Sequence, residues 1–426
     1  MKLFSRVVFV LLAVLVVAWL LYGLFGGQLI KAMYEERSVG FLNHLIHGRD
    51  IHPFLFYSEM AHEIAVQFSF YVIFVCWAIM LLGFLGRSSN GKAVLFGILW
   101  CLVIILSIET VLYVCKAGWE AAILKYPPRY IAMTNYGVAK PTPGRHRVSE
   151  AAIKTGRLIY DVECSIDQYG RRITPLAAEG KRDKFILFFG CSFTYGDGVK
   201  DDQTLPFYVA ERTARYMPYN YGFHGRGPFD ILAELENINF QSEVREKNGI
   251  LIYVFIDDHV HRAIGSSSVW GWKFHGVYYR QAEDGKLVRA GSFLTGKPFL
   301  TRIYQILGKS RILRVLKISF PIRIRDPHIK LAASAIWQIK ENFNAQYPRG
   351  EFYVLIYPSS QFGGRLIDYL KGMGIRYLDY RHLFFNNDPR FRLPEGDDHP
   401  SALAHKTIAE KLVEDLELDD AIKMYP

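Results

Sequence analysis

The chain has 426 residues, of which half are apolar and 15% are aromatic, so general disorder is excluded and two or three domains are expected. Its net charge is +10, and five cysteines are too few for a disulfide-stapled scaffold. No internal repeat and no nucleic-acid-binding motif is recognisable in the sequence, so no nucleic-acid partner is expected.

Three long apolar runs dominate the first 116 residues, at 7–25, 65–86 and 93–115. Each has about the 20 residues that a helix needs to cross a bilayer, and each is apolar on every face. We therefore expect three transmembrane helices rather than buried helices of a soluble domain. The first run has an alternative as a cleaved signal peptide, but its apolar core is long and no small-x-small cleavage site follows it.

Positive charges near the expected spans predict their orientation. Lys2 and Arg6 precede the first span, and Arg87 and Lys92 lie in the short link between the second and third. Because short cytoplasmic loops are enriched in Lys and Arg, these ends are expected on the cytoplasmic side. The chain beyond about residue 116 would then be extracytoplasmic, which in a bacterium is the periplasmic side of the inner membrane. The lipid bilayer is an expected partner of this multi-pass region.

After this membrane region the sequence predicts two further parts. Residues 117–180 contain Pro-Pro, Pro-Thr-Pro-Gly and scattered basic residues, which favour a linker and lead-in. Residues 181–426 alternate short apolar runs with helical patterns, and they carry an insertion at 263–350. The alternation predicts an α/β domain with a parallel sheet covered on both faces. The expected strands are 185–190, 219–222, 249–256, 352–357 and 375–379, and the expected helices are 204–216, 229–240, 328–345, 361–372 and 401–416.

A serine follows the first expected strand in the stretch "FILFFGCSFTYG". Ser192 lies two residues beyond that strand, at the edge where parallel sheets place their sites. A serine is a weak nucleophile until a base takes its proton, and "GDDHPSALAH" offers His399 before the last helix. Asp397 or the adjacent Asp398 would orient the imidazole, and Asp397 is the preferred candidate. The glycines of "NYGFHGRGP", residues 220–228, would let backbone amides face an oxyanion.

These three motifs together resemble the SGNH (GDSL) hydrolase superfamily, over residues 185–256 and 351–414. The resemblance implies a three-layer α/β/α flavodoxin-like sandwich, here preceded by the membrane helices. It implies Ser192 as nucleophile, His399 as base, and the backbone amides of Ser192 and Gly225 as oxyanion donors. The family cleaves or transfers acyl esters, frequently acetyl groups on glycans, so the expected partner is an acylated glycan or small molecule. No organic cofactor and no metal is implied.

The chain departs from the family pattern at three positions. Cys191 replaces the aspartate of the Gly-Asp-Ser motif, and Asp397 lies two rather than three residues before His399. Asp257 occupies the place of the asparagine that usually completes the oxyanion hole. An ionised carboxylate repels an oxyanion and would serve there only if protonated. A membrane-anchored esterase is therefore expected, with an O-acyltransferase of envelope polysaccharide or a weakly active or inactive glycan-binding or scaffold protein as alternatives.

Several patterns keep more than one interpretation. "DDHVH" and "DDHP" are compatible with a divalent metal site. Cys164 and Cys191 are either a disulfide or buried thiols. Residues 299–330 carry eight Lys or Arg and one acid, Asp326, which fits an anionic membrane surface, an acidic glycan or a solvated helix. The aromatic residues of 266–280 either stack on sugars or pack internally.

Overall fold

The computed structural model describes residues 130–152, 157–176, 181–269 and 273–418, a strand at Ala122–Lys125 and four isolated positions between 105 and 112. The chain divides into two units, Met1–Lys116 and Ala117–Pro426. The three expected transmembrane runs lie outside the described residues, apart from those isolated positions. Within the described part, no helix combines the length and apolarity needed to cross a membrane. The strands and helices from β1 to α15 all lie in the second unit.

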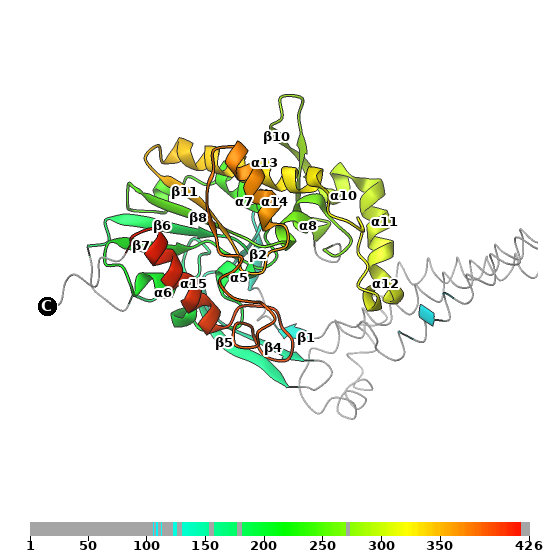
Figure 1. Ribbon diagram of the computed structural model, residues 1–426, viewed down its shortest axis with the longest axis horizontal. Helices are drawn as coiled ribbons and strands as arrows, with labels where there is room; N and C mark the ends of the chain where they lie inside the picture. The colour runs from blue at the N-terminus through cyan, green and yellow to red at the C-terminus, as the bar shows by residue number, and fades with distance from the viewer. Residues whose placement is uncertain are drawn as a thin grey trace, which may run out of the picture. The chain divides into compact units, whose positions relative to one another are not determined.

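A five-stranded parallel sheet forms the centre of this unit (Figure 1). Its strands are β6 (Lys184–Phe189), β7 (Tyr216–Asn220), β8 (Gly249–Phe255), β11 (Glu351–Ile356) and β12 (Arg376–Asp379). They lie in the order β12-β11-β8-β6-β7, and every neighbouring pair is parallel. Numbered along the chain, this is the 2-1-3-4-5 order of flavodoxin-like folds. The predicted parallel sheet is confirmed, and each strand begins and ends within three residues of its expected range.

Helices cover both faces of the sheet, because alternate residues of each strand point to opposite sides. Phe185, Leu187 and Phe189 of β6 belong to one apolar core, and Ile186 and Phe188 belong to another. The first core is closed by α7 (Pro228–Asn237), α8 (Asp258–Ile264), α13 (Asp326–Gln346) and α14 (Gly363–Gly372). The second is closed by α6 (Leu205–Ala210) and α15 (Ala402–Asp415). The result is the expected three-layer α/β/α sandwich.

The described residues of the expected linker are folded. They form the hairpin of β2 (Ile131–Met133) and β3 (Ala139–Pro141), and a second antiparallel sheet of β1 (Ala122–Lys125), β4 (Gly144–Ala152) and β5 (Leu158–Ile166). Tyr130, Val148 and Ile166 are buried in a third core together with Tyr195, which follows Ser192 closely. The linker prediction for 117–180 is thus wrong for these residues, since the Pro-Thr-Pro-Gly stretch is a turn between β3 and β4.

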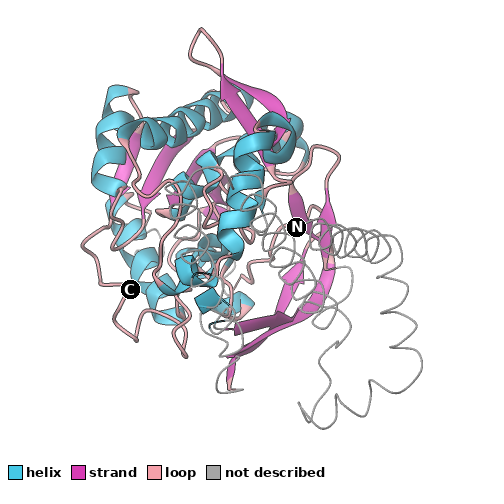
Figure 2. Ribbon diagram, turned by 90° about the vertical axis from the view of Figure 1, so that its right-hand side faces the viewer, coloured by secondary structure: helices cyan, strands magenta, loops and turns pink. Residues whose placement is uncertain are grey.

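The insertion is smaller than predicted, because α13 within 263–350 is a core helix. The added elements are β9 (Val277–Gln281), β10 (Leu287–Ser292), α10 (Phe293–Gly296), α11 (Pro298–Lys309) and α12 (Arg311–Val315). The β9–β10 hairpin projects from the domain in both views (Figures 1 and 2). Short helical turns at η1 (Asp201–Gln203), η2 (Phe240–Ser242) and α5 (Ser192–Tyr195) complete the domain.

Candidate active site

Ser192 opens the one-turn helix α5, three residues beyond the end of β6. The turn is tight because Gly190 has no side chain. A Cβ on Gly190 would run into the Thr194 side chain and lie 3.2 Å from the carbonyl oxygen of Val254. The next loop is tied to α5 by Asn220 at the end of β7, whose amide donates to the carbonyl oxygens of Thr194 and Tyr195, both at 3.2 Å. The tight turn at Gly190 and the Asn220 hydrogen bonds therefore hold Ser192 above the carboxyl edge of the sheet.

The structure brings Ser192, His399 and Asp397 into one hydrogen-bonded row. The Nε2 atom of His399 lies 2.9 Å from the Oγ atom of Ser192. Its Nδ1 atom lies 2.7 Å from Oδ1 of Asp397, which also accepts from the His399 backbone N–H at 2.7 Å. A carboxylate on Nδ1 keeps Nε2 available as the proton acceptor for the serine. This is the arrangement that activates a serine nucleophile.

Asp397, and not Asp398, is the carboxylate that contacts the imidazole. The Asp398 side chain is 84% exposed and forms an ion pair with Arg392 at 3.4 Å. Asp397 is largely buried, which by itself would raise its pKa. The hydrogen bonds and positive charge of His399 outweigh burial, so the pKa of Asp397 lies below its ordinary value. Asp397 is thus held ionised beside the imidazole.

Two further acids surround His399 and were not predicted as site residues. Oδ2 of Asp197 lies 3.7 Å from Nε2 of His399 and 2.6 Å from Nδ1 of His224. Glu150 of β4 interacts with Asp397, and burial and the Asp397 charge raise the pKa of Glu150. Burial lowers the pKa of His399, but the Asp397 hydrogen bond and the charges of Asp197, Asp397 and Glu150 raise it to about 9. His399 is therefore mostly protonated at neutral pH.

This raised pKa predicts an alkaline activity profile. Only neutral His399 can accept the Ser192 proton, and at pH 7 roughly one molecule in a hundred is in that state. The value of kcat/KM for ester cleavage is expected to rise with pH, with a midpoint near pH 9. Buried His405 has a pKa lowered to about 3 by burial and by Arg172, so it brings no positive charge that would oppose this effect.

Asp197→Asn removes a negative charge that lies 3.7 Å from Nε2 of His399. The pKa of His399 should therefore fall, and the midpoint of the pH profile should move to lower pH. The control is Asp388→Asn, whose carboxylate binds Arg390 in an exposed loop. Titration of kcat/KM for both variants checks the assignment. A wild-type midpoint near 6.5, or a midpoint that Asp197→Asn leaves in place, would contradict it.

Asp257, the residue expected at the asparagine position of the oxyanion hole, lines the cavity beside Ser192 and is bonded to a neighbouring loop. Its carboxylate accepts hydrogen bonds from the Ser360 hydroxyl, from the Gln361 N–H at 2.6 Å and from the Phe362 N–H at 3.1 Å. These groups lie in the loop that leads from β11 into α14. Asp257 is thus an acceptor whose hydrogen bonds anchor this loop.

Asp257→Asn is therefore expected to weaken the fold rather than to create a missing donor. An asparagine amide keeps one acceptor and turns an N–H₂ group toward a backbone N–H, which costs about 1–3 kcal/mol for buried pairs and less at this partly exposed site. The midpoint of urea unfolding measures the effect, with exposed Asp398→Asn as control. An Asp257→Asn variant with unchanged stability and faster ester cleavage would refute this role.

A cavity of about 380 Å³ opens beside Ser192 and His399. Asp257, Asp258 and Arg262 of the β8–α8 region line it, and Arg262 is the one Lys or Arg among the described residues that do so. The guanidinium of Arg262 donates to the Arg226 carbonyl at 2.9 Å and to Asp258 at 3.2 Å. Gly225, the expected oxyanion donor, is in a left-handed conformation with φ of +64° and precedes Arg226.

The metal and disulfide interpretations find no support in the described residues. Within that part of the chain, no group of three or more His, Cys, Asp or Glu side chains is placed to hold a metal ion. His259 of the "DDHVH" stretch is buried, and its Nδ1 lies 2.9 Å from the Tyr253 hydroxyl. Cys164 and Cys191 are both buried thiols that form no disulfide.

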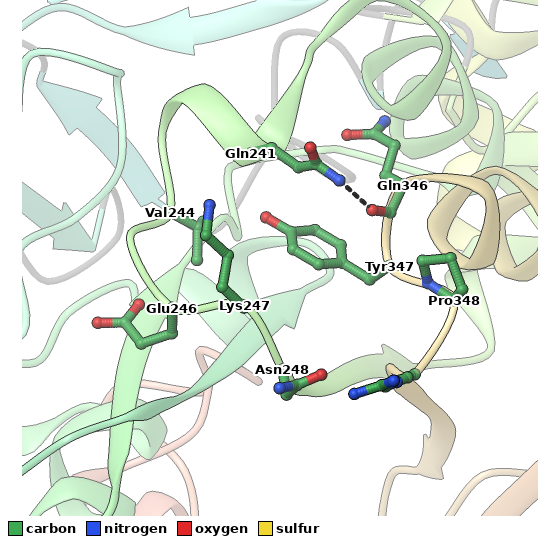
Figure 3. Close-up of a pocket in the computed structure, with 9 residues that line it drawn as sticks. Gln241, Val244, Glu246, Lys247, Asn248, Gln346, Tyr347 and Pro348 are labelled. Carbon is green, nitrogen blue, oxygen red and sulfur yellow. Dashed lines mark hydrogen bonds between the residues drawn. The ribbon is translucent and has the colours of Figure 1, made fainter.

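A second cavity, of about 220 Å³, lies at the opposite edge of the sheet (Figure 3). Asn248 and the Tyr347–Arg349 segment line it, and they precede β8 and β11. The Gln241 side chain crosses one side and donates to the Gln346 carbonyl. Because it lies at the amino ends of the strands, this cavity is separate from the row of Ser192, His399 and Asp397.

The sequence did not predict four residues that contribute to the site: Glu150, Asp197, His224 and Arg262. Asp197 and His224 come into contact only because the loops after β6 and β7 lie together. Asp197 could have been found from the sequence, because it lies five residues after Ser192 in the Gly-rich turn. Arg262 lies on α8, one helical turn beyond Asp258, and nothing in its sequence context marks it.

Comparisons with known proteins give distant structural likenesses. No family model and no curated protein matches the chain. Among solved structures, 27 chains match. An acetyl xylan esterase (Est2A) from the rumen bacterium Butyrivibrio proteoclasticus is 11% identical with a TM-score of 0.33, and the match covers 58% of this chain and 65% of that one. A member of the lipolytic G-D-S-L family from Veillonella parvula DSM 2008 is 12% identical with a TM-score of 0.31, over 54% of this chain and 97% of that one.

Proposed function

We propose that this protein is a serine esterase that cleaves ester-linked acyl groups, with acetyl groups on envelope glycans as the substrate class. The observation that carries the proposal is the row in which Ser192 Oγ lies 2.9 Å from His399 Nε2 and His399 Nδ1 lies 2.7 Å from Asp397. The position of this row at the carboxyl edge of the parallel sheet, beside a cavity of about 380 Å³, supports it.

The proposed reaction has two steps with a covalent intermediate. The Ser192 oxygen attacks the ester carbonyl while its proton passes to Nε2 of His399, and the imidazolium then protonates the leaving alkoxide. A water molecule next gives a proton to His399 and attacks the acyl-serine, which releases the carboxylic acid and restores the serine hydroxyl. Asp397 stabilises the imidazolium in both steps.

We place the oxyanion near the backbone N–H groups of Ser192 and Gly225, with Arg262 as the positive group that serves in place of the absent asparagine. Arg262 is buried, lines the cavity and is anchored by the carbonyl of Arg226, the residue after Gly225. Asp257 and Asp258 also face this cavity, so a guanidinium there offsets their charge as an oxyanion develops.

Arg262→Met is expected to lower kcat by roughly 10²- to 10³-fold with a small change in KM, because the interaction forms mainly in the transition state. Arg262→Lys should recover part of kcat, since it keeps the charge. The control is Arg365→Met, which removes an exposed ion pair with Asp326. An effect confined to KM would show instead that Arg262 binds the substrate.

The location remains part of the proposal. Three spans at 7–25, 65–86 and 93–115 would anchor the chain in the cytoplasmic membrane, with the second unit on the extracytoplasmic side. The uniform apolarity of these runs and the positions of Lys2, Arg6, Arg87 and Lys92 support this topology.

The activity is tested on the purified full-length chain with a chromogenic acetyl ester and with acetylated polysaccharide, in the presence and absence of a deacetylated glycan acceptor. Release of acetate from both substrates supports the esterase. An O-acyltransferase uses the same residues and would instead pass the acetyl group to the acceptor. Absence of both reactions in folded protein, at pH 9 as well as pH 7, would refute the proposal and favour a binding protein.

A further inference from the structure

The surface of α11, α12 and the segment that follows them departs from an ordinary solvated face. Four large apolar side chains are widely open to solvent there: Phe299 at 80%, Ile306 at 63%, Leu316 at 60% and Ile322 at 72%. Soluble domains seldom expose apolar side chains in such a group, and groups of this kind mark interaction sites. The segment lies at the side of the domain remote from α15 (Figure 1).

Basic residues are interleaved with these apolar side chains. Arg302, Lys317, Arg323 and Arg325 are exposed in the same segment. The sequence contains no Asp or Glu from residue 285 to residue 325, although it contains ten Lys or Arg there. The four exposed basic side chains therefore present positive charge in a stretch whose own sequence holds no acid.

The two kinds of side chain share one face of α11. Phe299, Arg302 and Ile306 stand at positions i, i+3 and i+7, which lie along one side of a helix. All three are exposed, whereas Thr301 on the inner side is buried and its hydroxyl donates to the Phe293 carbonyl at 2.9 Å. The helix thus has its anchoring side toward the domain and its apolar and basic side toward the exterior.

We propose that this face, called here the α11–α12 surface, rests on a bilayer that contains anionic lipids. Helices that lie in the membrane interface combine apolar side chains that enter the acyl boundary with Lys and Arg that meet the headgroups. An acidic glycan would match the charge but would give Phe299, Ile306 and Ile322 no apolar phase to enter. This surface is independent of the proposed esterase activity.

The test uses the full-length chain with one added cysteine on the surface, Ile306→Cys or Ile322→Cys. The control is Phe385→Cys, outside the α11–α12 surface, because Phe385 is 74% exposed and matches Ile322 closely. Each variant is reconstituted in vesicles of phosphatidylglycerol and phosphatidylcholine, in phosphatidylcholine alone, and in detergent. The rate of labelling by a membrane-impermeant maleimide is measured by peptide mapping and divided by the rate at Phe385→Cys.

In the anionic vesicles, the relative labelling rate at both surface positions is expected to fall at least about tenfold below that in phosphatidylcholine. High salt, or the triple change Arg302→Glu, Lys317→Glu and Arg323→Glu, should restore it. Equal rates in the two kinds of vesicle would overturn the proposal. So would protection that persists in detergent, which would mean that protein covers the surface, or equal protection by an acidic polysaccharide without lipid.

Discussion

Ser192→Ala is expected to lower the rate of ester cleavage by roughly 10⁴- to 10⁶-fold, because no other group takes over the covalent step. His399→Ala should cause a loss of similar size, since Ser192 then loses the acceptor that lies 2.9 Å away. The residual rate would come from substrate binding and the remaining hydrogen-bond donors. The measurement is kcat/KM for an activated acetyl ester at pH 9, where the neutral form of His399 is well populated in wild type.

The double variant separates a catalytic unit from two unrelated defects. If Ser192 and His399 act together, Ser192→Ala combined with His399→Ala should be little slower than either single variant. The control is His382→Ala, because His382 is exposed and lies outside the hydrogen-bonded row of Ser192, His399 and Asp397. His405→Ala is unsuitable, because His405 is buried and its loss would disturb packing. Losses of kcat/KM that multiply in the double variant would contradict the proposed roles.

Arg172→Met is expected to destabilise the second unit by about 3–5 kcal/mol, the cost of breaking a buried charged network. The Arg172 side chain is almost fully buried and donates to Asp201 at 2.8 Å. It also donates to three backbone carbonyls of the loop after Ser192: Tyr195 at 3.1 Å, Gly196 at 2.5 Å and Val199 at 2.7 Å. Methionine fills similar space but donates to none of these oxygens; the Tyr195 carbonyl keeps the Asn220 amide as a donor, whereas the Val199 carbonyl and Oδ1 of Asp201 lose the guanidinium.

The matched control is Arg157→Met, since the Arg157 side chain is 75% exposed and pairs with Glu395 at 3.4 Å. An exposed pair of this kind contributes about 0–1 kcal/mol. Thermal unfolding of the full-length chain compares the two variants, and Arg172→Lys serves if the methionine variant fails to fold. Equal unfolding midpoints for wild type, Arg172→Met and Arg172→Lys would show that the loop after Ser192 does not depend on Arg172.

Arg172 also shows where the sequence was informative and where it was not. The sheet could be predicted because β6 and β8 are continuous apolar runs, buried on both faces. β7 begins three residues and ends two residues before its predicted range, because it contains Pro218, which an edge strand tolerates. The strands before β6, in the part of the chain that includes Arg172, were not predicted, because several of them are short and the prolines between them are typical of a linker.

Part of the candidate site could likewise be predicted from the sequence, and part could not. Ser192, His399 and Asp397 follow strands or precede a helix in recognisable motifs, and the structure brings these three side chains into contact. The acids that raise the pKa of His399 reach it only through long-range packing. Glu150 comes from β4, and Asp197 lies in a loop whose carbonyl oxygens at Gly196 and Val199 accept hydrogen bonds from Arg172. The orientation of Asp257 depends on the loop at 360–362, a hundred residues away, which no local pattern predicts.

The most direct test of an activated serine is reaction of the purified full-length chain with a fluorophosphonate probe at pH 9, followed by peptide mapping. We expect one phosphonylated residue, Ser192, with labelling abolished in Ser192→Ala and strongly slowed in His399→Ala. Ser360→Ala is the control, since Ser360 lines the same cavity but bonds Asp257 instead of a histidine. Folded wild-type protein that resists the probe, or labelling that persists in Ser192→Ala, would show that Ser192 is not an activated nucleophile.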